Sequence, residues 1–149
     1  MKVAVGADHA GCTLKAALAD HLRGLGHEVL DFGASDPSVS VDYPVYALAV
    51  GKAVASGDAE LGVLVCGTGI GMSIAANKVQ GVRAALVHDA TTARLAREHN
   101  NANVFVVGGR LMAAPLAVEL LDVFLSTSFE PRHARRLELI ASIEGHEKA

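Results

Sequence analysis

A cysteine opens a glycine-rich run in the middle of the chain, Cys66-Gly67-Thr68-Gly69-Ile70-Gly71. The apolar residues before it are typical of a strand and those after it have helical spacing, so the run should connect a strand to a helix. Glycines in such a turn let backbone amides approach an oxyanion or a phosphate closely. A cysteine at the same point is favoured as the thiolate, which is a base or a nucleophile. The motif predicts an anion-binding turn with a reactive thiol, or more plainly a tight turn around a packed cysteine.

The same run partly matches a dinucleotide-binding fingerprint, which requires Gly-x-Gly-x-x-Gly and an acidic residue about twenty positions later. Asp89 has a suitable spacing, but Met72 stands where the third glycine should be. The match also falls late in the chain, so nucleotide binding is the weaker interpretation. Thr68, inside the run, offers its hydroxyl to the cysteine or to a substrate oxygen, or only to the local backbone.

Asp8 and His9 follow the first apolar run and pair a carboxylate with an imidazole. The pair suits proton transfer or anion binding. An aspartate at this point equally suits a helix cap, which would leave His9 exposed. Both alternatives stay open on the sequence alone.

Further polar residues come late in the chain. Arg132 and Arg136 stand four positions apart, so on a helix they share one face and can converge on one phosphate; the plainer alternative is a solvated pair. His99 and Asn100 fall between a helix and a strand, at the sheet edge opposite the carboxyl ends. If they are catalytic, we expect them to reach a neighbouring subunit's site. Otherwise His99 is a helix-terminal cation and Asn100 a turn former.

Short runs rich in valine and leucine alternate with longer segments of helical periodicity, which is typical of a parallel α/β sheet. We therefore predict a three-layer, doubly wound, Rossmann-like sheet of five parallel strands in the order 2-1-3-4-5, with a C-terminal helix. Ligands bind such sheets where the strand order reverses, here between the first and third strands. The predicted strands are Lys2–Ala7, Glu28–Phe32, Leu61–Cys66, Val82–Val87 and Asn103–Val107. The predicted helices are Leu14–Leu25, Asp42–Ser56, Gly71–Lys78, Asp89–Glu98, one from Pro115 and one after Pro131.

The composition narrows the classes of partner and the compartment. A length of 149 residues suits one domain over residues 1–149, and 51% hydrophobic with only 4% aromatic residues predicts an aliphatic core. A net charge of −3 without a basic block argues against nucleic-acid and membrane partners. Two cysteines suggest neither a disulfide framework nor a zinc site, and no apolar run is long enough for a signal peptide or a membrane span. We expect an unprocessed cytoplasmic protein.

With these residues assembled, the chain resembles the ribose-5-phosphate isomerase B family, which also includes galactose-6-phosphate isomerase subunits. The resemblance runs nearly end to end, and its motifs are specific in combination. Some relatives carry serine at the cysteine position and a glutamate base shortly after the glycines. Cys66 and Met72 place this chain with the cysteine-base type. The matching stretches are Gly6–Gly11, Asp42–Pro44, Cys66–Gly71, Ser73–Lys78, His99–Asn100, Gly109–Arg110, and Arg132–His133 with Arg136.

The resemblance implies an aldose–ketose isomerase that interconverts ribose 5-phosphate and ribulose 5-phosphate and requires no metal or nicotinamide. It implies Cys66 as the base that moves a proton between C1 and C2, assisted by Thr68, with Asp8 and His99 opening the furanose ring. Alternatives are isomerisation of hexose 6-phosphates, or a non-catalytic phosphosugar- or nucleotide-binding module. A homodimer or dimer of dimers with a site shared between subunits is expected. The implied substrate contacts are His9, Tyr43, Gly67, Gly69, Ile70, Gly71, Asn100, Arg110, Arg132 and Arg136, whereas Arg135 has no implied role.

Overall fold

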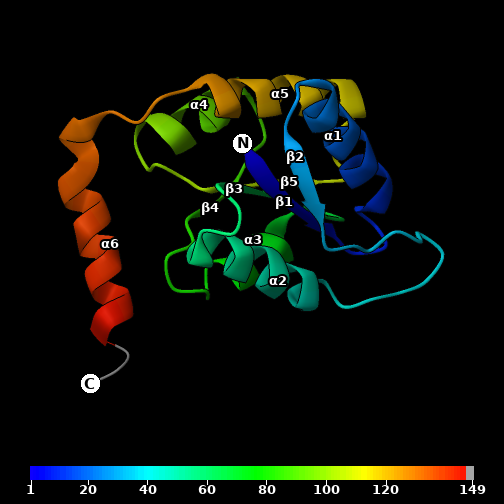
Figure 1. Ribbon diagram of the computed structural model, residues 1–149, viewed down its shortest axis with the longest axis horizontal. Helices are drawn as coiled ribbons and strands as arrows, with labels where there is room; N and C mark the ends of the chain where they lie inside the picture. Colours follow the sequence, from blue (N-terminus) through cyan, green and yellow to red (C-terminus); the bar gives the residue numbers. More distant parts are fainter. Residues whose placement is uncertain (147–149) are drawn as a thin grey trace.

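The computed structural model describes residues 1–146 and shows five parallel strands in one sheet, with helices on both faces (Figure 1). The last three residues of the predicted domain, 147–149, lie outside the described residues. None of the described helices has the length and apolar composition of a membrane span. The strands are β1 Lys2–Ala7, β2 Glu28–Asp31, β3 Leu61–Cys66, β4 Ala84–Leu86 and β5 Val104–Gly108. The helices are α1 Cys12–Gly24, α2 Tyr43–Ser56, α3 Ile70–Ala76, α4 Ala90–Glu98, α5 Ala114–Ser126, the 3₁₀ turn η1 Pro131–His133, and α6 Ala134–His146.

The strand order is β2-β1-β3-β5-β4, so the predicted order 2-1-3-4-5 is wrong in its last two strands. β5 pairs with β3 along its whole length, and every one of its residues is buried. β4 has only three residues, all half-buried, and short strands of this kind are suited to a sheet edge. The longer and more apolar strand therefore takes the central position, and β4 forms the margin.

The crossover from β4 to β5 runs back toward the middle of the sheet, and its direction decides which face α4 covers. Right-handed crossovers that advance in one direction along a sheet place their helices on one face, and a crossover in the opposite direction uses the other face. Accordingly, α2 and α3 pack on one face, while α4 joins α1 and α5 on the other (Figure 1). Leu18 and Leu121, with the ring pair Phe105 and Phe124, are buried between the sheet and α1, α4 and α5. Val50 and Met72 are buried between the sheet and α2 and α3.

Local sequence signals set the helix starts as expected. Asp89 caps α4, because its Oδ1 accepts a hydrogen bond from the Thr92 N–H at 2.7 Å and Thr92 Oγ1 accepts one from the Asp89 N–H at 3.2 Å. The hydrogen bond from the Thr92 backbone lowers the pKa of the Asp89 carboxyl. Pro44 and Pro115 stand in the first turns of α2 and α5. The capping role of Asp89 commits its carboxylate to the helix, which weakens the dinucleotide interpretation.

α6 extends away from the layered body of the molecule (Figure 1). Its apolar side chains are exposed, with Leu139 55% and Ile143 65% accessible. A hollow of about 560 Å³ separates part of α6 from the body, and Glu144 bridges it by accepting a hydrogen bond from the Gly81 N–H at 3.1 Å. An apolar helix face that its own chain leaves uncovered suits contact with another protein chain.

Candidate active site

The ends of β1, β3 and β5 meet at one edge of the sheet, and the loops that follow them contact one another. The Asp8 N–H donates a hydrogen bond to the Val65 carbonyl at 3.3 Å, across β1 and β3. The Gly109 N–H donates to the Cys66 carbonyl at 2.8 Å, across β3 and β5. The predicted meeting of the first and third strands is therefore confirmed. The loop after β5 joins them because of the corrected strand order.

The Cys66 thiol lies at the end of β3, where it is only 4% accessible. Its Sγ accepts a hydrogen bond from the Gly69 N–H at 3.2 Å. Gly69 has a left-handed backbone, with φ +80°, that turns its amide back toward the strand, and a Cβ there would lie 2.5 Å from Cδ1 of Leu86. An amide that points at the sulfur stabilises negative charge on it. The turn thus combines a thiol with an anion-stabilising donor.

Two side chains from other elements cover the glycines of this run. A Cβ on Gly67 would lie 3.2 Å from Nη1 of Arg110, and a Cβ on Gly71 would lie 2.5 Å from the ring of Tyr43. Arg110 follows β5, and its N–H donates to the Gly67 carbonyl at 2.9 Å, whereas Tyr43 begins α2. The missing side chains at the two glycines therefore let a guanidinium and a phenol ring border the backbone of the turn.

Thr68 binds the local backbone, which is the plainer of its two alternatives. Its Oγ1 accepts a hydrogen bond from the Ile70 N–H at 3.2 Å. Since the hydroxyl acts as the acceptor here, its own proton remains available for donation. The side chain of Ile70 is 54% exposed, so this residue contributes its amide to the turn and an apolar group to the surface.

Asp8 and His9 are both held by backbone amides. Asp8 Oδ1 accepts hydrogen bonds from the N–H groups of Ala10 and Gly11, each at 3.0 Å, in the turn before α1. The helix-cap alternative is wrong, because the N-cap of α1 is Gly11 and no side chain in the described part of the chain caps the helix. The other oxygen, Oδ2, takes no part in these two bonds. His9 Nδ1 accepts from the Val41 N–H at 3.2 Å, which leaves Nε2 to carry the proton of the neutral imidazole. His9 can therefore donate a hydrogen bond from Nε2 to an anion.

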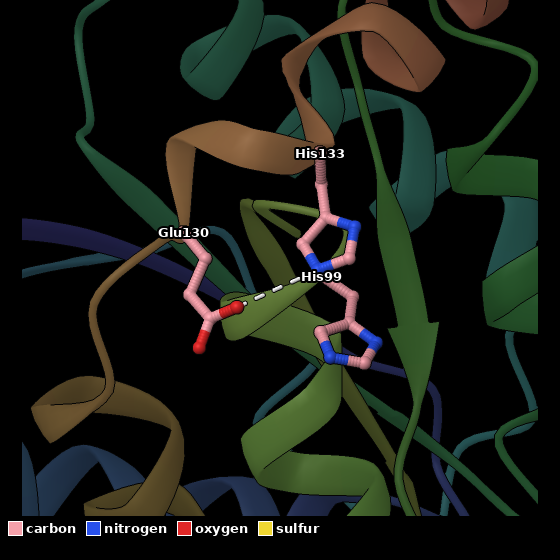
Figure 2. A group of neighbouring side chains, drawn as sticks. All are labelled: His99, Glu130 and His133. Carbon is pink, nitrogen blue, oxygen red and sulfur yellow. Dashed lines mark ion pairs between the residues drawn. The ribbon is translucent and has the colours of Figure 1, made fainter.

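His99 lies at the opposite edge of the sheet, because it follows α4 and precedes β5. It stacks on His133, with ring centroids 4.3 Å apart, and Nε2 of His133 lies 3.6 Å from Oε2 of Glu130 (Figure 2). We call His99, Glu130 and His133 the histidine cluster. Asn100, next in the chain, is exposed at the same edge. Within one chain, the cluster and Cys66 are thus on opposite ends of the strands.

The two predicted phosphate-binding arginines accompany the histidine cluster. Arg132 belongs to η1 and Arg136 to α6, and both line a hollow of about 500 Å³ with His133. Nε of Arg132 donates to Oε2 of Glu130 at 2.6 Å. This hydrogen bond is the main reason that the pKa of Glu130 is lowered. Arg135, for which the resemblance implies no role, is an exposed residue of α6 and lines the same hollow.

Sequence reasoning missed Glu130 and His133 as members of a site. Burial, followed by the nearby charges of Arg132 and His99, lowers the pKa of His133. The available signal was the proximity of an acid, a histidine and three arginines within Glu130 to Arg136. That signal could not reveal the stacking on His99, which is more than thirty positions earlier.

Comparison with known proteins gives a consistent result. Residues 3–140 match the family described as Ribose/Galactose Isomerase. The chain is 44% identical over 144 residues to the galactose-6-phosphate isomerase subunit LacB of Clostridium acetobutylicum, covering 97% of this chain and 82% of that protein. It is also 44% identical over 144 residues to ribose-5-phosphate isomerase B of Escherichia coli K12, covering 96% of each. The solved structure of Clostridium thermocellum ribose-5-phosphate isomerase B superposes with a TM-score of 0.96 at 45% identity, covering 99% of each chain. With Cys66 and the glycine run at the end of β3, the chain therefore belongs to the ribose/galactose isomerase family.

Proposed function

We propose that this chain interconverts ribose 5-phosphate and ribulose 5-phosphate, with Cys66 as the base. The observation that carries the proposal is the Cys66 Sγ held 3.2 Å from the Gly69 N–H where β1, β3 and β5 end, in a chain of this family. The thiolate takes a proton from the carbon beside the carbonyl, which leaves an enediolate, and the proton returns to the neighbouring carbon. No net oxidation occurs, because the C1 aldehyde is reduced to an alcohol while the C2 alcohol of the same molecule is oxidised to the ketone.

The amides of the glycine run support this chemistry by stabilising the enediolate oxygen. One such donor contributes about 10²- to 10³-fold in rate, and a positioned base contributes about 10²- to 10⁴-fold. Thr68 is proposed to assist with its hydroxyl proton, while Tyr43 and Arg110 contact the sugar from either side of the turn. His9 is proposed to donate from Nε2 to the phosphate. Binding of the unreactive phosphate holds the sugar during both proton transfers.

A homodimer with shared sites reconciles the positions of the remaining residues. Ring opening is proposed to need Asp8 and His99, yet Asp8 follows β1 and His99 precedes β5, at opposite edges of one sheet. A second chain would bring His99 of the partner subunit to Cys66, and Asn100, Arg132 and Arg136 of the partner subunit with it. The exposed apolar face of α6 supports such an assembly. A dimer of dimers is compatible with the same sharing.

The cytoplasm is the proposed compartment. Cys12 and Cys66 are both free thiols and both buried. A reducing compartment keeps the Cys66 sulfur in the reduced form that a base requires.

A substrate panel tests the proposed reaction. We expect purified protein to convert ribose 5-phosphate to ribulose 5-phosphate, measured by the absorbance of the ketose product. Hexose 6-phosphates are the second candidate substrates, because identity to the galactose-6-phosphate isomerase subunit equals identity to ribose-5-phosphate isomerase B. Comparing kcat/KM for ribose 5-phosphate, allose 6-phosphate and galactose 6-phosphate separates the two. No turnover of any of the three would contradict the isomerase proposal itself.

Replacing Gly69 by alanine tests the role of its amide. We expect Gly69→Ala to lose at least about 1–2 kcal/mol of unfolding free energy, because L-residues are strained at positive φ and the new Cβ would lie 2.5 Å from Cδ1 of Leu86. We also expect kcat to fall about 10²-fold, because the new Cβ forces the amide away from Sγ and from the enediolate. Gly57→Ala is the control for backbone strain alone, since Gly57 has φ +85° and open space around a Cβ. It should show the stability loss in urea unfolding without the loss in kcat, and equal kcat for the two variants would contradict the role.

A further inference from the structure

We propose that the histidine cluster, His99, Glu130 and His133, binds a divalent transition-metal cation of the zinc type. One ligand atom from each residue lies within 4.8 Å of the others (Figure 2). The three residues come from the end of α4, the segment before η1, and η1 itself. The Glu130 N–H donates to the Glu98 carbonyl at 2.9 Å, which ties the second of these segments to the end of α4. The cluster is therefore held together by the backbone as well as by its side chains.

The strongest single indication is Nε2 of His133. This nitrogen is buried and has no hydrogen-bond partner among residues 1–146, and the side chain is only 9% exposed. It points toward Oε2 of Glu130 but stops at 3.6 Å, beyond hydrogen-bonding distance. Buried polar atoms of this kind usually have a partner.

Two imidazoles and one carboxylate match the ligand set of zinc sites that retain an open position. Zinc bonds to these atoms measure about 2.0–2.2 Å, so tetrahedral ligand atoms lie about 3.3 Å apart. The cluster must therefore contract by about 1.5 Å at most from its 4.8 Å limit. His99 and Glu130 are half-buried and can turn inward, whereas His133 is fixed by burial. Magnesium and calcium are disfavoured here, because they select oxygen ligands.

Arg132 opposes the cation, and this gives the proposal a distinctive consequence. Nε of Arg132 donates to the Glu130 Oε2 that a metal would use, at 2.6 Å. A bound cation must displace this guanidinium and repel its charge. The next expectation rests on the proposed function. Zinc bound to His99 would remove this imidazole from ring opening, and the displaced Arg132 would leave its place at the phosphate. We therefore expect zinc to inhibit the isomerase.

The test measures metal binding directly, by competition between the full-length protein and a coloured zinc chelator. We expect His133→Ala and Glu130→Gln to lower the affinity for zinc at least about tenfold. Substitution of residues that only hydrogen-bond to metal ligands already causes losses of this size. His21→Ala is the control, because His21 forms an exposed pair with Asp122 at 2.6 Å and offers a similar chance site. Arg132→Ala should bind zinc more tightly than the unchanged protein. Magnesium in excess should not displace zinc.

The variants also cover failures of folding and of the proposed function. Glu130→Gln keeps the shape of a half-buried side chain, so it remains informative if His133→Ala does not fold. Equal zinc affinity for Glu130→Gln, His21→Ala and the unchanged protein would overturn the site, as would weaker binding by Arg132→Ala. Because the readout is chelator absorbance, a protein that binds zinc in the expected pattern but isomerises no sugar contradicts only the proposed function.

Discussion

Replacing Cys66 by alanine is expected to lower kcat by about 10²- to 10⁴-fold, the contribution of a positioned base, while leaving the affinity for sugar phosphate nearly unchanged. The proposed phosphate contacts, His9 and the arginines, do not involve the thiol. Turnover is measured by ketose formation, and affinity by calorimetric titration with ribose 5-phosphate. The substitution removes one sulfur next to a glycine turn, so the fold should persist.

Cys12→Ala provides the matched control for this experiment. Cys12 is as buried as Cys66, and its Sγ donates to the Ala34 carbonyl at 3.0 Å, away from the glycine run. We expect this variant to keep its kcat. If Cys66→Ala retained full turnover, another group would be the base. If the unchanged protein bound sugar phosphate without turning it over, the chain would be the non-catalytic phosphosugar-binding module that its sequence also allowed.

The bounds of β1 and β3 could be predicted from the sequence, whereas the order of the strands could not. Apolar runs and helical periodicity predict β1 and β3 with their observed ends, because both strands are buried and end at polar residues or glycine. Periodicity states that β4 and β5 are strands, but it does not say which one lies beside β3. That choice depends on burial. The five buried residues of β5 gain more hydrophobic free energy from a position beside β3 than the three half-buried residues of β4 would.

The strand-order error also hid part of the site. With β5 at the edge, Arg110 would lie far from Cys66, and only the family resemblance placed it near the substrate. With β5 beside β3, Arg110 covers Gly67, which is a contact across loops that no local pattern encodes. The ring of Tyr43 over Gly71 is of the same kind. Side chains that meet through tertiary packing, rather than through spacing along one element, are what sequence reasoning could not supply.

Mixing two inactive variants is expected to restore activity if each site draws residues from two chains. Cys66→Ala and His99→Ala should each be inactive as homodimers. In a mixed dimer, one site joins the intact Cys66 of one chain to the intact His99 of the other, while the second site lacks both. Random exchange of equal amounts gives mixed dimers in half of the population, so about a quarter of the normal activity should return.

The matching control mixes Cys66→Ala with Asp8→Ala. Asp8 and Cys66 end neighbouring strands of the same chain, so each site of this mixed dimer lacks one of them. No activity should return, although the subunits exchange equally well. Exchange itself is verified with differently tagged chains and mass spectrometry. No recovery in the first pair despite exchange would show that His99 and Cys66 of different chains do not share a site. Recovery in the control pair would show that Asp8 and Cys66 do not act from the same chain. Comparing the activity recovered by the two pairs therefore shows which residues of one site come from the same chain and which come from the partner. This conclusion does not depend on how strongly any single substitution impairs catalysis.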